Sequence, residues 1–306
     1  MHKYLYFIFI TTTLFATELI TPIPTNISIN HNKAKLGELL FHDPRLSKDN
    51  TVSCASCHIL NDGGDDNLAV SIGINGQQGT RNAPTVFNAR FNSFQFWDGR
   101  AKNLEEQATG PIHNPVEMGS TLKEVLIKLK KDSTYNKHFN KIYQDGITEK
   151  NIIDAIVEFE NTLITPNSTF DKYLRGDKNI LTKEEKEGYV LFKEYGCISC
   201  HNGINIGGNL MQKMGIIEDF KNRDLGKFII TNKEEDKYYF KVPSLRNITL
   251  TSPYFHDGKI KTLKEAINQM SFFQVGYALK NEETDKIIAF LKTLTGEIPI
   301  LKEDDE

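Results

Sequence analysis

Apolar residues recur at helical spacing in four stretches of the chain, which are residues 32–41, 152–163, 183–197 and 282–294. Because side chains three and four positions apart share one face of an α-helix, each stretch predicts an amphipathic helix with one buried face. The alternation typical of strands is sparse, and residues 237–242 are the best short candidate. We therefore predict a mainly α-helical chain with long loops and little β-structure.

Two of the predicted helices stand before the same short motif. Residues 37–41 and 188–192 share the pattern Gly-x-x-Leu-Phe, and each leads to a Cys-x-x-Cys-His sequence. Further on, residues 96–100 (Phe-Trp-Asp-Gly-Arg) align with residues 255–259 (Phe-His-Asp-Gly-Lys) at an offset of 159 positions. Internal similarity at a fixed offset indicates a duplicated unit. We expect two tandem helical domains, residues 17–165 and 166–306.

The first residues have the pattern of a secretory signal. Lys3 precedes an apolar run from Tyr4 to Ile10, and the small residue Ala16 offers a cleavage point. The run is too short for a comfortable membrane span, although an uncleaved anchor is the alternative interpretation. We expect residues 1–16 to be removed and the mature protein to be exported and soluble.

Composition narrows the classes of function. Hydrophobic residues make up 39% of the 306 positions and charged residues 25%, which is typical of a globular chain. The formal net charge is −3 and no basic run occurs, so we expect no nucleic-acid partner.

Two Cys-x-x-Cys-His motifs end in His58 and His201, and they contain all four cysteines, which are Cys54, Cys57, Cys197 and Cys200. This is the attachment signature of c-type haem, in which the thiols bond to the porphyrin and the histidine can ligate the iron. Disulfides would leave both histidines unexplained. A zinc ribbon needs its pairs roughly 15–20 residues apart, whereas Cys57 and Cys197 are 140 apart. We expect two covalently bound c-type haems.

The two irons are expected to differ in their second axial ligand. Met270 lies in a helical stretch of the second copy and can complete a His/Met pair, although a buried core methionine is the alternative. The offset of 159 puts Pro111 at this place in the first copy, and proline cannot ligate iron. Gln107 and Glu117 follow in that region, and a carboxylate beside an open iron suits proton handling for peroxide. Taken alone, Glu117 would be read as an ordinary surface residue.

Taken together, these features resemble the bacterial di-haem cytochrome c peroxidase family over nearly the whole mature chain. Besides the two haem motifs, the resemblance rests on Arg81-Asn82-Ala83-Pro84-Thr85, Phe96-Trp97-Asp98-Gly99-Arg100, Gly110-Pro111, Asn114-Pro115-Val116-Glu117-Met118 and Pro253-Tyr254-Phe255-His256. It implies two cytochrome c-like domains in a periplasmic homodimer. It also implies reduction of hydrogen peroxide to water with electrons from a small cytochrome c or copper protein.

The resemblance implies roles for single residues as well. The first haem would be the low-potential peroxidatic one, with Glu117 as acid/base and Gln107 beside it. The second would be the high-potential entry site, with His201 and Met270 as axial ligands. Trp97 would lie between the haems and help to pass electrons. A calcium ion at the domain interface is also implied, held by the Asn82 side chain and two backbone carbonyls, those of Thr251 and Pro253.

One departure from the family pattern concerns the resting state of the first haem. Many members carry a distal histidine in a Ser-Ile-Gly-His context, where this chain has Ile74. We therefore expect a first haem that is open, or weakly capped, in the isolated protein. His113 is the nearest other residue by sequence that could cap the iron, but we interpret it as a loop histidine.

Two other functions stay open at this point. A di-haem maturation oxidase would carry a tyrosine in place of the second haem's methionine, and Met270 argues against it. A non-enzymatic electron carrier or redox sensor would need two six-coordinate haems, and Pro111 argues against that.

Overall fold

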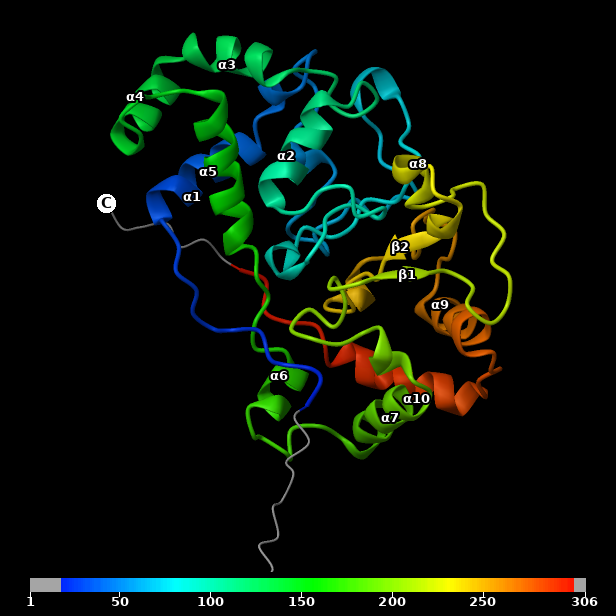
Figure 1. The fold of residues 1–306 in the computed structure, drawn as a ribbon. Coiled ribbons are helices and arrows are strands. Elements are labelled where there is room, and N and C mark those ends of the chain that lie inside the picture. Colours follow the sequence, from blue (N-terminus) through cyan, green and yellow to red (C-terminus); the bar gives the residue numbers. More distant parts are fainter. Residues whose placement is uncertain (1–17, 300–306) are drawn as a thin grey trace, which may run out of the picture.

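The computed structural model describes residues 18–299, so the predicted signal segment lies outside the described residues. Two helical lobes are joined by a region of long loops (Figure 1). The helices of the first lobe are α1 His31–Phe41, α2 Leu104–His113, α3 Leu122–Lys130, α4 Ser133–Ile142 and α5 Glu149–Thr162. Those of the second are α6 Thr169–Leu174, α7 Lys183–Glu194, α8 Phe228–Thr231, α9 Leu263–Met270 and α10 Asn281–Lys292.

Strands are few in the described part of the chain. Strands β1, Met211–Lys213, and β2, Tyr239–Lys241, form one antiparallel pair in which Met211 lies opposite Lys241. The predicted strand at residues 237–242 is therefore present in shortened form. The prediction of a mainly helical fold with little β-structure is confirmed. Among residues 18–299, no helix has the length and apolar character needed to cross a membrane.

Each lobe is built on one pair of tightly packed helices. In the first lobe, a Cβ atom added to Gly37 of α1 would lie 1.9 Å from the carbonyl oxygen of Ala155 in α5. In the second lobe, a Cβ on Gly188 of α7 would lie 1.9 Å from the carbonyl oxygen of Lys286 in α10. Only glycine allows backbones to approach this closely, so the shared Gly-x-x-Leu-Phe pattern encodes the same helix crossing twice.

The duplication extends to the loops behind the helices. Asn88 and Asn247 both adopt the left-handed conformation, with φ of 61° and 59°. Both side chains donate to the same buried hydroxyl, that of Thr165, at 2.8 and 2.9 Å. Thr165 thus ties the two lobes together at the place where the sequence predicted their boundary. The exact domain limits stay a prediction.

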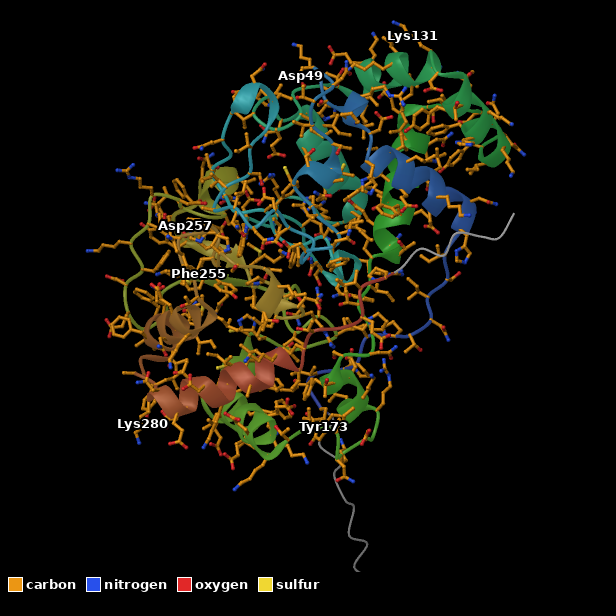
Figure 2. All side chains as sticks on the ribbon, turned by 180° about the vertical axis from the view of Figure 1, so that it is seen from behind. Asp49, Lys131, Tyr173, Phe255, Asp257 and Lys280 are labelled. Atoms are coloured by element: carbon orange, nitrogen blue, oxygen red, sulfur yellow. The ribbon has the colours of Figure 1, made fainter. Side chains whose placement is uncertain are left out.

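The segment before α1 packs away from the first lobe. Ile20 belongs to the apolar core of the second lobe, and the buried Arg246 donates to the carbonyl of Thr21 at 3.1 Å. Arg246 is also paired with Asp171 at 2.7 Å, and neither side chain is exposed. Figure 2 shows the molecule from behind, with Tyr173 and Lys280 marking the second lobe.

The lobes meet through a symmetric exchange of backbone hydrogen bonds. The amide of Asn82 donates to the carbonyl of His256 at 2.8 Å, and the amide of Lys241 donates to that of Trp97 at 2.7 Å. The offset of 159 relates Asn82 to Lys241 and Trp97 to His256. The interface between the lobes therefore has approximate two-fold symmetry, and Trp97 and His256 lie at its centre.

Candidate active site

The first haem motif presents its histidine in a defined orientation. The motif forms a short 3₁₀ turn at Cys54–Ser56, and Nδ1 of His58 lies 3.1 Å from the carbonyl oxygen of Gly64. Because a carbonyl only accepts, Nδ1 carries the proton and Nε2 keeps its lone pair for a metal. Burial lowers the pKa of His58, which favours the neutral, ligating form.

These residues open onto a cavity of about 840 Å³. Cys54, Cys57 and His58 line one side, and residues of α2 and the following loop, among them Gln107 and Glu117, line another. The second lobe contributes lining residues as well, which include Asn222, Arg223, Asp224, Asp257 and Lys259. The structure therefore brings the predicted peroxidatic residues together around one space.

The chemistry of the lining fits a covalently attached haem. Two thiols and an oriented imidazole stand where the attachment motif requires them. Arg81 and Arg100 also line the cavity, where they would offer cationic groups to the haem carboxylates. Arg81 is held between Asp98 at 2.5 Å and Asp224 of the second lobe at 2.6 Å. No disulfide joins the four cysteines, all of which belong to the described residues.

Glu117 is placed by the turn that ends α2. Asn114 caps α2, accepts a hydrogen bond from the amide of Val116 at 3.1 Å, and donates from Nδ2 to Oε1 of Glu117 at 2.7 Å. Burial raises the pKa of Glu117, while the Asn114 bond and the charge of Arg100 oppose that rise. A carboxyl group whose pKa moves toward neutrality is suited to proton transfer.

Ile74 fixes the loop that would otherwise carry a distal ligand. Its side chain is 5% exposed and belongs to the first apolar core, and its amide donates to the carbonyl of Glu117 at 2.9 Å. The neighbouring Gly73 packs so closely that a Cβ there would lie 2.0 Å from the carbonyl oxygen of Val116. His113 is exposed, accepts from the amide of Leu122 at 3.4 Å, and is not among the lining residues. The structure therefore gives no support to His113 as a cap.

The second haem motif repeats the arrangement of the first. Nδ1 of His201 lies 3.4 Å from the carbonyl oxygen of Ile206, again leaving Nε2 for iron. Burial lowers the pKa of His201 to about 4. Met270 is the last residue of α9, which corresponds to α2 of the first lobe. The donor set fits a haem with one histidine and one methionine ligand.

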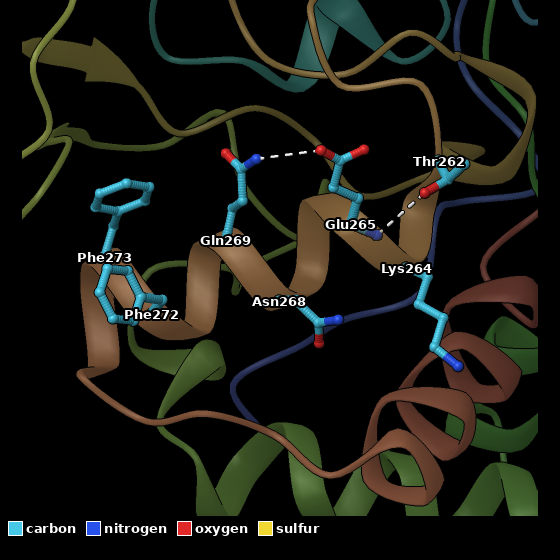
Figure 3. Close-up of a pocket in the computed structure, with 7 residues that line it drawn as sticks. All are labelled: Thr262, Lys264, Glu265, Asn268, Gln269, Phe272 and Phe273. Carbon is cyan, nitrogen blue, oxygen red and sulfur yellow. Dashed lines mark hydrogen bonds between the residues drawn. The ribbon is translucent and has the colours of Figure 1, made fainter.

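The outer face of α9 has a shallow groove of its own (Figure 3). It measures about 580 Å³ and is lined by residues such as Thr262, Glu265 and Gln269. In Figure 3, Gln269 and Glu265 contact each other along the helix, at 3.4 Å. None of the groove's lining residues is a predicted haem ligand, so we place the chemistry in the larger cavity.

Trp97 and His256 face each other between the lobes. Their ring centroids are 6.2 Å apart and nearly perpendicular, and Nε1 of Trp97 donates to the carbonyl of Asn82 at 2.9 Å. His256 is 4% exposed and stacks on Phe240 at 4.2 Å, and its Nε2 has no hydrogen-bond partner. The sequence comparison aligned His256 with Trp97 but did not indicate this buried, unpartnered nitrogen.

Asn82 and the buried Asp65 bear on the calcium site that the family resemblance implies. Asn82 is buried, and its Nδ2 donates to the carbonyl of Leu68 at 2.7 Å, which orients the amide. Asp65 is 1% exposed and neither of its carboxylate oxygens has a hydrogen-bond partner. A Cβ on Gly63 would lie 2.8 Å from Asp65 Oδ1 and 2.6 Å from the carbonyl oxygen of Leu250, so Asp65 sits near the segment that contains Thr251 and Pro253. A buried, unpaired carboxylate is costly, and a cation would relieve that cost.

Comparison with known proteins places the chain in a family. A family model described as di-haem cytochrome c peroxidase matches residues 31–179, and one for cytochrome c matches residues 185–295. The cytochrome c551 peroxidase of Nitrosomonas europaea is 50% identical over 290 residues, which cover 94% of this chain and 87% of that protein. The cytochrome c peroxidase Ccp of Escherichia coli is 49% identical over 285 residues, or 91% of this chain, but the match spans only 61% of that longer protein.

A solved structure supports the same relationship at a greater distance. It is that of a MauG-like protein associated with microbial copper homeostasis, with a TM-score of 0.81 and 28% identity. The match covers 94% of this chain and 96% of that one. The relatives named as peroxidases are much more similar in sequence, and they confirm the class of enzyme that the motifs indicated. The chain belongs to the di-haem cytochrome c peroxidase family.

Proposed function

We propose that the chain reduces hydrogen peroxide to water with two electrons that a small redox protein delivers one at a time. The first lobe would bind peroxide and the second would receive electrons. The observation that carries this proposal is the difference between the two lobes at the sixth-ligand position. Pro111 lines the first cavity at the place that Met270 occupies at the end of α9.

Glu117 is the group we propose for proton transfer. The haem, when bound, supplies the redox chemistry at its iron. Asn114 holds Oε1 of Glu117, which leaves Oε2 to take a proton from bound peroxide and return it to the departing oxygen. The rise in its pKa favours the protonated form, from which the proton is returned to the departing oxygen. Gln107 lines the same cavity and can orient peroxide with its amide.

We further propose that the first haem is open in the fully oxidised protein. Support comes from Ile74, which has no ligating atom and is buried in the core rather than directed at a metal. Its amide is bonded to the carbonyl of Glu117, so the loop and the proton-transfer residue hold each other in place. Peroxide would then reach the site without a prior movement of this loop.

Electron transfer between the lobes would follow the contact of Trp97 with His256. His201 and Met270 would ligate the second iron and give it the higher potential, since His/Met ligation raises potential. Trp97 lines the first cavity and lies against His256 of the second lobe. This contact is a short path between the two halves of the molecule.

Calcium, assembly and location complete the proposal. Asn82, Thr251 and Pro253 would hold calcium at the lobe interface, and the unpaired carboxylate of Asp65 supports a cation there. The resemblance to the family also supports export by the first residues, a periplasmic location and a homodimer. The electron donor would be a small cytochrome c or a copper protein.

A stoichiometric assay tests the function. Holoprotein mixed with a reduced small cytochrome c and hydrogen peroxide should oxidise two equivalents of donor per peroxide. The assay should give the same ratio when started from fully oxidised and from half-reduced protein. Donor oxidation independent of peroxide, with both haems cycling, would instead indicate an electron carrier or sensor.

The maturation-oxidase alternative is tested separately by the spectrum of the second haem. Methionine ligation at Met270 predicts the long-wavelength sulfur-to-iron band of ferric His/Met haems. Its absence would remove the ligand assignment that separates this chain from the maturation oxidases.

A further inference from the structure

A second acid lies in the first haem cavity, and neither the motifs nor the proposed mechanism uses it. Glu160 belongs to the last turn of α5 and lines the same cavity as Cys54 and Glu117. Its side chain is 6% exposed, and its Oε2 has no hydrogen-bond partner. An unpartnered acid in an apolar helix face is costly, so its retention calls for a reason beyond packing.

The second lobe provides an internal reference for this position. Gly37 packs against Ala155 and Phe159 of α5, as Gly188 packs against Lys286 and Phe290 of α10. The residue after Phe159 is Glu160, and the residue after Phe290 is Leu291. Leu291 is buried in the apolar core of its lobe. The fold therefore accepts an apolar side chain at this position, and the acid is particular to the peroxide-binding lobe.

The surroundings favour a neutral, protonated Glu160. Burial raises its pKa to about 8, and the charge of Glu105 on α2 adds to the rise. Cys54 faces it from the haem motif and loses its titratable proton once haem is attached. The cations on the other elements packed against α5 are engaged elsewhere. Lys33 of α1 pairs with Asp154, Lys128 of α3 donates to backbone carbonyls, and Arg90 donates to the carbonyl of Asn161.

We propose that Glu160 is a redox-linked proton site of the first haem. When that haem gains an electron, the Glu160 carboxylate takes up one proton from solvent; when the haem loses the electron, Glu160 releases the proton. Charge in the cavity is then balanced in both redox states, which matters because an uncompensated charge in a low-dielectric site is expensive. The inference rests on the proposed attachment of haem at Cys54 and Cys57, but it does not require peroxide turnover.

The test is a spectroelectrochemical titration of the holoprotein between pH 6 and pH 10. In the wild type, the reduction potential of the first haem should fall by up to about 59 mV for each pH unit. This slope corresponds to a tenfold change in the equilibrium constant of a one-electron reduction. Glu160→Gln keeps the shape of the side chain and should lose this component. Glu149→Gln, which removes an exposed acid from the first turn of the same helix α5, is the matched control and should keep it.

The second haem and a second variant at Glu160 serve as controls for correct folding. The slope of the second haem should be the same in all variants, which confirms that the fold and the second site are intact. Glu160→Leu, which copies Leu291, serves if the glutamine variant is poorly folded. A first-haem slope in Glu160→Gln or Glu160→Leu equal to that of the wild type would overturn the proposal. Wild-type protein that shows the pH-dependent slope but does not reduce peroxide would count against the proposed function and leave this proposal standing.

Discussion

Gly37 and Gly188 occupy the same place in the two lobes, and each allows a helix crossing that no other residue would permit. The side chains of Asn88 and Asn247 likewise both donate to the hydroxyl of Thr165. The glycines are alike because the backbones approach too closely for a side chain to be added, and the asparagines are alike because both side chains donate to one buried hydroxyl. The shared features thus belong to the packing of the helices and loops.

The positions that face the haem sites have diverged. Pro111 stands where the second lobe has Met270, and Glu160 where it has Leu291. Both lobes keep the same helix crossing although these residues differ, so the crossing does not require a particular side chain at these positions. This difference is the basis of our proposal that one lobe holds a closed electron-transfer site and the other an open reaction site.

The largest expected effect comes from removing the proton-transfer group of the open lobe. Glu117→Gln should lower turnover by about 10²–10⁴-fold, the usual contribution of general acid–base catalysis. The spectra of both haems should be unchanged, because Asn114 can still contact the amide. Steady-state peroxidase assays would measure this, with Glu105→Gln as the matched control. Turnover close to that of the wild type would remove Glu117 from the mechanism.

The next effect tests the shared packing. Gly37→Ala and Gly188→Ala should each lower the free energy of unfolding by about 1–3 kcal/mol, since each Cβ would overlap a carbonyl oxygen of the facing helix. Each variant should disturb the haem of its own lobe first, as followed by absorbance during thermal unfolding. Gly79→Ala is the control, because its nearest neighbour would be 3.6 Å away. Equal stability of all three variants would show that the two crossings are not the shared constraint.

A smaller effect concerns stability and pH. While the first haem is reduced, Glu160 keeps its proton in the folded protein up to a pKa of about 8, whereas in the unfolded chain it loses the proton near 4.5. Folded protein therefore binds more protons between these values, and stability should fall as the pH rises, by about 1.4 kcal/mol per pH unit from this group. Glu160→Leu should flatten that part of the curve in denaturant titrations. A curve parallel to the wild type would show that Glu160 does not titrate in this range.

The sequence predicted the parts of the molecule that depend on local pattern. The helices α1, α5, α7 and α10 appear within a few residues of their predicted bounds. The two haem motifs present their histidines as expected. By contrast, α3 and α4 were not predicted; both are short and carry many polar residues.

Other features could not be read from local pattern because they depend on burial and on contacts distant in sequence. Asp65 and Glu160 look like ordinary acids until the fold removes them from water. His256 shows its unpartnered nitrogen only when Phe240 and Trp97 enclose it. The alignment of α5 with α10 was the one signal that could have singled out Glu160, since it places Leu291 opposite it.

The central claim, that one lobe is open and the other closed in the resting protein, is tested most directly by ligand binding to fully oxidised holoprotein. Azide added without reductant should change the spectrum of one haem only. Ile74→Val, which keeps the buried side chain apolar, should behave as the wild type. The account would be contradicted if neither haem of the wild type bound azide before reduction.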